Sequence, residues 1–270
     1  MDKPWASRKQ RQACFGLWVA SALWIGSAQA LTLSKSEALR IGKKIWQNEC
    51  NGTISGLTSW NSGEDFASLG IGHFIWYPEG KRGPFEESFP KLLSFIADRD
   101  VAVPSWLRPT GACPWSSQAQ FERAQQSPQM AELRQFLAGT VDLQAQFLVD
   151  RLDRALPKML EETAPENRPH VQQQFNRVAN SAQGCYALVD YVNFKGEGVL
   201  HSERYHGEGW GLLQVLEAMR GTADGVEAVR EFSRAAGSIL VRRVKNSPPE
   251  RKETRWLPGW LNRVKSYAAT

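Results

Sequence analysis

The sequence is poor in the side chains from which metal centres are usually built. It contains four cysteines and four histidines in 270 residues, and no two cysteines have a Cys-x-x-Cys spacing. Structural zinc sites need four closely spaced Cys or His ligands, so this composition argues against one. We predict neither a metal nor an organic cofactor.

Long hydrophobic runs are also missing. The apolar segment 13–26 is the main candidate, and it is shorter than the roughly 20 residues that a membrane-spanning helix needs. A membrane protein with several spans is therefore excluded. Hydrophobic residues at 42% and charged residues at 23% are typical of a globular chain and not of a disordered one. The length allows one large domain or two modest ones.

Residues 1–30 are typical of an export signal. Basic side chains at positions 3, 8, 9 and 11 precede the apolar segment, and Ala28-Gln29-Ala30 has the small-x-small pattern of a signal peptidase site. We predict that the mature chain begins at Leu31 and is located in the periplasm or secreted, with no integral membrane segment. The alternative is that residues 1–30 remain as a membrane anchor.

Signal removal would also remove most of the excess positive charge. The net charge of +5 would fall to +2, with 29 basic against 27 acidic residues. No extended basic stripe would remain, so we expect no nucleic-acid partner. Cys50, Cys113 and Cys185 would stay in an oxidising compartment, where any two could pair and one would be left over.

The patterning predicts an α+β domain with a small β-containing N-terminal lobe, a larger helical lobe and a cleft between them. Ser34 to Glu37 has capping-box spacing, and apolar residues at helical intervals extend a helix to about Glu49. Gly, Ser, Asn and aromatic residues up to Pro84 predict short strands and turns. Later apolar stripes predict helices. The expected division is residues 31–84 for the first helix and β-region and residues 85–270 for the helical lobe.

Glu49 is the first candidate for catalysis because it continues the apolar face of the predicted helix at its C-terminal end. There the helix dipole and partial burial both disfavour a charged carboxylate, so we expect a raised pKa suited to a general acid. Glu64 and Asp65 follow in a turn across the predicted cleft. Two carboxyl groups facing one cleft are the minimum for glycoside hydrolysis: one protonates the leaving oxygen, and the other activates water or stabilises positive charge.

The segment Ser68-Leu69-Gly70-Ile71-Gly72-His73 resembles the phage-type lysozymes. In that family a catalytic Glu ends the first helix, and a following strand has the pattern T-x-G-x-G-H, here with Ser in place of Thr. Residues 186–196 are similar to the family's A-L-x-x-x-x-x-N-x-G helix end. The resemblance implies a lysozyme-like domain over the whole mature chain that cleaves peptidoglycan glycan strands. It further implies Glu49 as general acid, Ser68 as the residue that orients water, and an ion pair for His73.

The spacing departs from the family. There an Asp follows the Glu by nine residues and the Thr by six more, whereas Ser68 lies nineteen residues after Glu49 and Ser62 occupies the Asp position. The second carboxylate must come from Glu64, which we prefer to Asp65 because Gly63 frees the turn, or it is absent. We predict that the Glu64 carboxylate lies within about 10 Å of that of Glu49. Without it, a single-Glu lytic transglycosylase or a non-catalytic glycan-binding protein is expected.

Glycines and aromatic residues of the β-region are candidates for binding sugar rings. Gly70 and Gly72 would leave a face without side chains against which a flat ring could lie. Aromatic rings have large flat apolar faces of the kind that stack on sugars, and the chain has eleven Trp. The predicted substrate-binding residues are Trp60, Asp65, Gly70, Gly72, Trp76 and Tyr77, with Tyr205 and Trp210 as further aromatic candidates.

Overall fold

A computed structural model describes residues 34–83, 85–107, 111–201 and 203–269. The predicted signal peptide, residues 1–30, lies outside the described residues. Contacts divide the chain into Met1–Ala30 and Leu31–Thr270, and all described residues belong to the second unit. None of the helices in this described part is long and apolar enough to cross a membrane.

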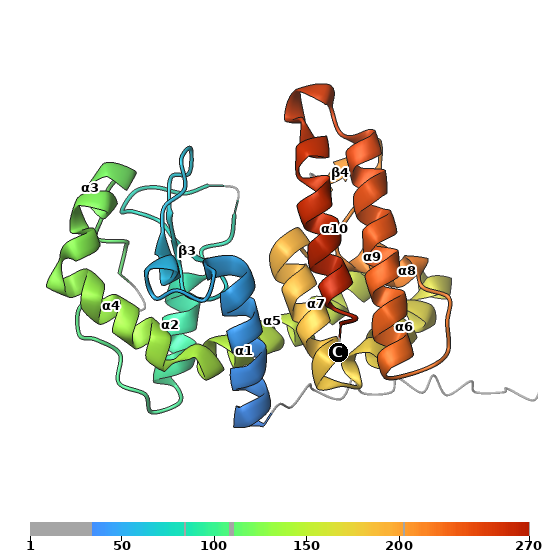
Figure 1. Cartoon of the computed structure of the whole chain (residues 1–270), viewed down its shortest axis with the longest axis horizontal. Coiled ribbons are helices and arrows are strands. Elements are labelled where there is room, and N and C mark those ends of the chain that lie inside the picture. The colour runs from blue at the N-terminus through green and yellow to red at the C-terminus, as the bar shows by residue number, and fades with distance from the viewer. Residues whose placement is uncertain (1–33, 84, 108–110, 202, 270) are drawn as a thin grey trace, which may run out of the picture. The chain divides into compact units, whose positions relative to one another are not determined.

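The described residues form ten α-helices and two small antiparallel sheets, so the predicted α+β class is confirmed (Figure 1). The helices are α1 (Lys35–Cys50), α2 (Phe89–Ala97), α3 (Gln118–Arg123), α4 (Pro128–Gly139), α5 (Val141–Glu162), α6 (Arg168–Ala179), α7 (Ala182–Lys195), α8 (Leu212–Ala218), α9 (Val226–Asn246) and α10 (Leu257–Ser266). The strands are β1 (Thr58–Ser59), β2 (Ala67–Leu69), β3 (Phe74–Trp76), β4 (Arg204–Tyr205) and β5 (Glu208–Gly209).

Helix α1 begins and ends where the sequence predicts. The Ser34 hydroxyl accepts a hydrogen bond from the Glu37 backbone N–H, and the Glu37 carboxylate accepts one from the Ser34 N–H, which completes the capping box. Gly42 lets the backbone of α5 approach closely, because an added Cβ would lie 2.8 Å from the Val141 carbonyl oxygen. The helix therefore packs on α5 and carries Glu49 in its last turn.

The first sheet has the order β1-β2-β3, with Ser68 paired to Ser59 on one side and to Ile75 on the other. The structure corrects the prediction that the strand continues to His73, because β2 ends at Leu69 and residues 70–73 form a turn. Gly70 has a φ of +69°, a left-handed conformation that glycine adopts without strain, and this turns the chain back.

Helix α5 connects two groups of elements. It packs against α1 and α2 near one end and against α6 and α7 near the other, while α9 packs against α8 and α10. Figure 1 shows α1–α4 and the first sheet on one side and α6–α10 on the other. The buried apolar side chains of both groups form one continuous core. The ends of α1 and α7 and one face of α10 are thereby brought together.

Candidate active site

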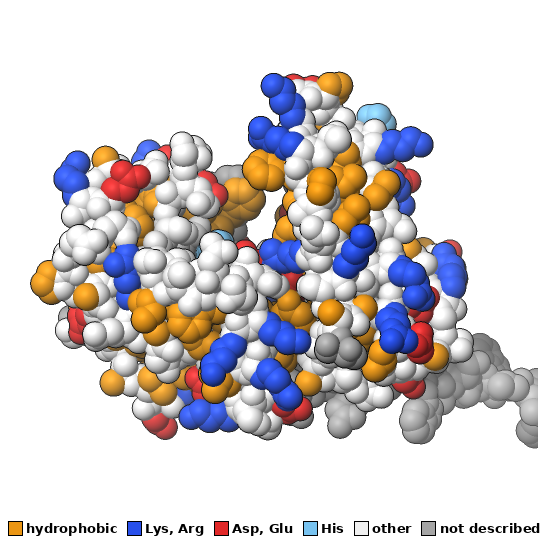
Figure 2. Space-filling model, in the orientation of Figure 1, with side chains coloured by type: hydrophobic (Ala, Val, Ile, Leu, Met, Phe, Trp, Pro, Cys, Tyr) orange, Lys and Arg blue, Asp and Glu red, His pale blue; other side chains and the backbone are white. Residues whose placement is uncertain are grey.

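Glu49 lines an open cleft of about 490 Å³. The walls come from the end of α1, the turn between β2 and β3, the end of α7, the segment before β4, and α9. Figure 2 shows the surface hollowed between these two groups of elements, with hydrophobic side chains on both walls. The Glu49 side chain is 13% exposed, so its carboxylate is held by protein groups yet still reaches the cleft.

Three side chains from distant parts of the chain surround the Glu49 carboxylate. Arg263 on α10 donates a hydrogen bond to Oε1 through Nη2, and Asn193 on α7 donates to the same oxygen at 3.3 Å. On the other side, His73 Nδ1 lies 3.8 Å from Oε2. The turn after β2 thus places His73 beside Glu49.

Asp190 on α7 is the second carboxylate of this cluster, and it is completely buried. It accepts hydrogen bonds from Arg263 Nε at 2.8 Å and Nη2 at 2.9 Å, and from the Tyr267 hydroxyl at 2.6 Å. Burial opposes the charge on Arg263, but hydrogen bonds and charge from Asp190, with the charge of Glu49, raise the pKa of the guanidinium. Arg263 therefore bridges the buried Asp190 and the Glu49 carboxylate and fixes the position of Glu49 at the edge of the cleft.

Glu203, which precedes β4, lines the same cleft and was missed by sequence reasoning. Burial raises the pKa of its carboxyl group and the charge of Glu197 acts in the same direction, whereas Arg243 opposes them. Its carboxylate lies against Gly196, where an added Cβ would be 3.0 Å from Oε2. Glu203 stands in no motif. The one signal that pointed to this region was the helix end 186–196, which brings Asn193 to the cleft.

Lys195 lies on the cleft wall with only 9% exposure. Its Nζ is 3.3 Å from the centre of the Trp260 ring and 3.9 Å from that of Phe194. Burial lowers the pKa of Lys195 to about 6, and the positive charge of Arg243 adds to this effect. The amine is therefore mostly uncharged at neutral pH.

We expect Lys195→Met to stabilise the fold, with the largest gain below about pH 6 and a smaller gain at each higher pH up to about 10. The folded chain releases the Lys195 proton at about pH 6, whereas an unfolded Lys keeps it to about pH 10.4. In that window the unfolded state binds more protons, so wild-type stability rises with pH and the advantage of Met shrinks. Urea unfolding at three pH values across the window measures the difference. The exposed Lys265→Met is the control, and a pH-independent gain for Lys195→Met would contradict the prediction.

The structure does not bring Glu64 or Asp65 to the Glu49 cleft. The turn that carries them closes on itself: the Trp60 indole N–H donates to the Glu64 carbonyl at 2.7 Å, and Asn61 Nδ2 donates to the Glu64 carboxylate at 3.1 Å. Asp65 is exposed. Neither residue lines the cleft. The acids that line it with Glu49 are Glu203 and Glu86, and Glu86 is ion-paired with Lys91.

Most of the other predicted site residues are buried away from the cleft, which corrects their expected roles. Ser68 is 3% exposed in the middle strand, and Trp76 and Tyr77 are each 1% exposed. Rings this deeply buried have no free face for a sugar. Trp60 is 8% exposed and packs on Phe121. The predicted residues that line the cleft are Glu49, Gly72 and, among the further aromatic candidates, Trp210.

The closeness of Gly70 to α5 explains why it does not form a sugar platform. An added Cβ would lie 2.4 Å from Gln144 Oε1, and the same oxygen accepts a hydrogen bond from the Ile71 N–H at 2.9 Å. Gly70 is buried, so its missing side chain accommodates Gln144 and not a ligand. The missing side chain of Gly70 therefore allows the turn to pack against α5.

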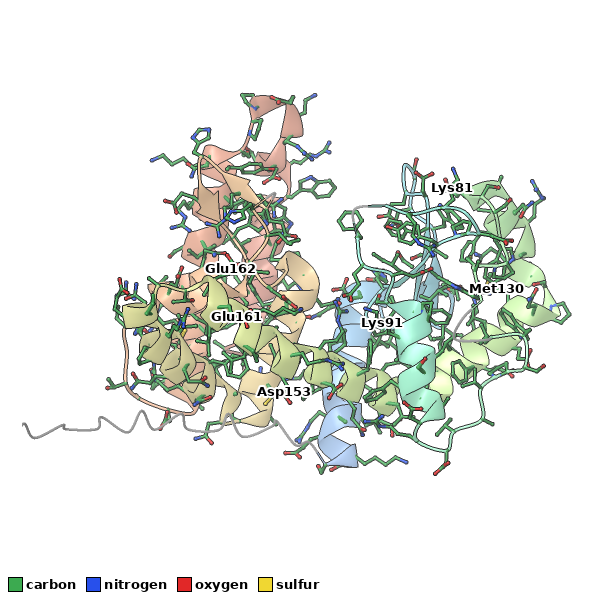
Figure 3. All side chains as sticks on the ribbon, turned by 180° about the vertical axis from the view of Figure 1, so that it is seen from behind. Lys81, Lys91, Met130, Asp153, Glu161 and Glu162 are labelled. Carbon is green, nitrogen blue, oxygen red and sulfur yellow. The ribbon has the colours of Figure 1, made fainter. Side chains whose placement is uncertain are left out.

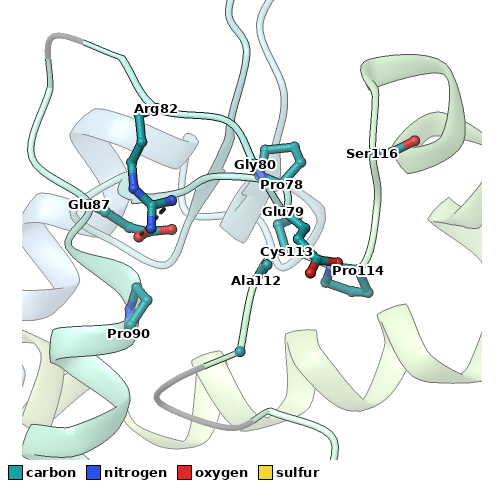
Figure 4. Close-up of a pocket in the computed structure, with 11 residues that line it drawn as sticks. Pro78, Glu79, Gly80, Arg82, Glu87, Pro90, Ala112, Cys113, Pro114 and Ser116 are labelled. Atoms are coloured by element: carbon teal, nitrogen blue, oxygen red, sulfur yellow. Dashed lines mark ion pairs between the residues drawn. The ribbon is translucent and has the colours of Figure 1, made fainter.

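A larger hollow of about 760 Å³ lies elsewhere, between the loop after β3 and the segment before α3 (Figure 4). Its charged pair is Arg82 and Glu87, whose Nη1 and Oε2 atoms are 3.9 Å apart. Cys113 also lines it, and burial raises the pKa of this thiol to about 12. The acids of this hollow are the exposed Glu79 and the ion-paired Glu87. We assign the active site to the Glu49 cleft because there the acid is held in place by side chains from α7 and α10.

Comparisons with protein-family models, with curated proteins and with solved structures found no match. Within the described ranges, no group of three or more His, Cys, Asp or Glu side chains could hold a metal ion. Cys50, Cys113 and Cys185 are buried and not joined by disulfides. The chemistry of the site is therefore argued from its carboxylates and their hydrogen bonds.

Proposed function

We propose that this protein is an exported, lysozyme-like enzyme that cleaves the glycan strands of peptidoglycan. The supporting observation is that one open cleft contains Glu49, held by Arg263 and Asn193, and the half-buried acid Glu203. Such a pair of carboxyl groups is the usual equipment for glycoside hydrolysis. The choice of peptidoglycan rests on the resemblance of residues 68–73 and 186–196 to phage-type lysozymes and on the predicted export signal.

In the proposed mechanism, Glu49 donates its proton to the glycosidic oxygen as the bond to the leaving sugar breaks. Arg263 then faces two carboxylates, and its guanidinium stabilises the charge that Glu49 acquires. Glu203 removes a proton from the attacking water. A raised pKa makes its carboxylate a stronger base than an ordinary Glu, provided that the pH is high enough to ionise it.

The acidic limb of the pH profile of kcat/KM should lie above the pKa of about 4.3 that is typical of Glu. Glu203 must be ionised to act as a base, so activity falls as the pH drops through its raised pKa. Wall hydrolysis measured from about pH 3 to 9 tests this. Glu203→Gln should lose most hydrolysis, whereas the exposed Glu208→Gln should retain it. If Glu203→Gln stays active and the acidic limb of its kcat/KM profile is unchanged, Glu203 is not part of the mechanism.

Analysis of the products formed from purified cell walls tests the proposed function. A hydrolase releases new reducing ends, whereas a lytic transglycosylase releases anhydro-sugar ends. The second activity is the alternative candidate because Glu64 and Asp65 lie away from the cleft, and a transglycosylase needs Glu49 alone. If neither product forms, both activities are contradicted and a glycan-binding role is favoured.

A further inference from the structure

A second groove, of about 470 Å³, continues from the cleft between α2 and α5. It shares Glu86, Ser88 and Arg151 with the cleft. Phe95 and Phe147 line it, with ring centres 5.3 Å apart in an edge-to-face contact. Figure 3 shows this side of the molecule, with Lys91 labelled on α2 beside α5. A ligand in the cleft could therefore extend into the groove without leaving the surface.

Four basic side chains line this groove. Arg151, Arg154 and Lys158 follow one another on α5 at the i, i+3, i+7 spacing that places side chains on one helix face. At 1.5 Å per residue the row covers about 10 Å along the helix. Lys91 lines the groove from α2. The row is long enough to meet more than one anionic group of the same ligand.

Of the four basic side chains that line the groove, the three other than Arg151 are paired with acids. Arg154 Nη2 lies 2.6 Å from Asp150, Lys158 Nζ lies 3.1 Å from Glu197, and Lys91 pairs with Glu86. The three basic side chains are more than half exposed. Exposed pairs of this kind contribute little to stability, about 0–1 kcal/mol. A ligand carboxylate can therefore replace the protein's own acid at small cost.

Arg151 differs from the others and stands where the groove meets the cleft. Its nearest ion-pair contact is Glu86 Oε2 at 3.9 Å, and its side chain is 33% exposed. Within the described part of the chain, its guanidinium makes no hydrogen bond. A guanidinium with free N–H groups can bind a carboxylate through two parallel hydrogen bonds. Arg151 is thus the natural first contact for an acidic group next to the cleaved bond.

We propose that this groove binds the carboxylates of the short peptides that branch from peptidoglycan glycan strands. The inference rests on the proposed function and specifies the form of substrate: strands that still carry their peptides. Such peptides project sideways from the sugar backbone and bear free carboxylates. A strand in the Glu49 cleft would direct one of them along α5, where Arg151, Arg154 and Lys158 would meet it in turn.

The test compares two substrates, peptide-bearing glycan strands and the same strands stripped of peptides by an amidase. For the wild type, kcat/KM should be about ten-fold or more higher on peptide-bearing strands, mainly through a lower KM, as expected for a charged hydrogen-bonded contact. In Arg151→Gln/Arg154→Gln the ratio of the two values should fall to near one. Arg234→Gln, an exposed arginine on α9, is the matched control and should keep the wild-type ratio. Thermal melting confirms that each variant is folded.

The possible outcomes distinguish failure of the peptide-binding inference from failure of the proposed glycan cleavage. Cleavage of both strand types at equal rates by the wild type, or an unchanged ratio in the double variant, would overturn the peptide-binding inference and leave the proposed function standing. If the wild type cleaves neither strand, the proposed function fails. In that case, pull-down of the two strand types by the wild type tests peptide binding alone. Preferential retention of peptide-bearing strands supports the peptide-binding inference, and equal retention overturns it.

Discussion

Replacing Glu49 by Gln is expected to lower kcat for wall cleavage by about 10²–10⁴-fold and to leave the fold intact. The Gln side chain has nearly the same shape, and its oxygen can still accept hydrogen bonds from Arg263 and Asn193. It has no proton to give to the glycosidic oxygen. The release of soluble fragments from purified walls, with near-UV circular dichroism as a check on packing, measures the effect.

An aryl glycoside substrate provides a sharper control for the role of Glu49. An activated phenolate departs without protonation, so Glu49→Gln should recover much of its lost rate on such a substrate, whereas Glu203→Gln should not. This pattern distinguishes the loss of a proton donor from general damage to the cleft. A well-folded Glu49→Gln protein with nearly full activity on walls would exclude Glu49 as the general acid.

Replacing Arg263 by Gln should have the largest effect on stability, a loss of about 3–5 kcal/mol in the free energy of unfolding. Asp190 is completely buried and receives two hydrogen bonds from the guanidinium. Without Arg263, a buried carboxylate would remain without its counter-charge. Urea denaturation measures the change, and the exposed Arg234→Gln should stay within about 0.5 kcal/mol of the wild type.

A double-mutant cycle shows whether the loss arises from the unpaired charge. Asp190→Asn together with Arg263→Gln removes both charges. The double variant should therefore lose less free energy of unfolding than the two single variants lose in sum. Strict additivity would mean that the two side chains do not interact energetically. The Tyr267 hydroxyl, which also donates to Asp190, can still find an acceptor in the Asn amide oxygen.

Local features of the sequence predicted the local features of the structure. The capping box at Ser34 and the apolar spacing of the first helix depend on neighbours within one or two turns, and α1 forms as predicted. The Gly- and aromatic-rich region up to Pro84 also forms short strands and turns, as predicted. Glu49 was found for the same reason: its place at a helix end is a local property.

The partners of Glu49 could not be predicted, because they depend on packing between distant elements. Arg263 lies in an ordinary amphipathic helix and Glu203 in a short connecting segment, and neither sequence context signals a site. The burial of Trp76 and Tyr77 was missed for a related reason. Neighbouring residues of a strand face opposite sides, and both sides are covered here, by Phe89 on Trp76 and by Phe66 on Tyr77.

The contact between Glu49 and Arg263 joins residues that are 214 positions apart. Contacts of such high sequence separation must bring distant segments together, which is slow and entropically costly. A ribosome makes Glu49 long before it makes α10, so in a chain that is still being synthesised Glu49 lacks its partner Arg263. In the proposed exported enzyme, catalytic competence would therefore arrive only with the docking of α10, which requires the complete chain.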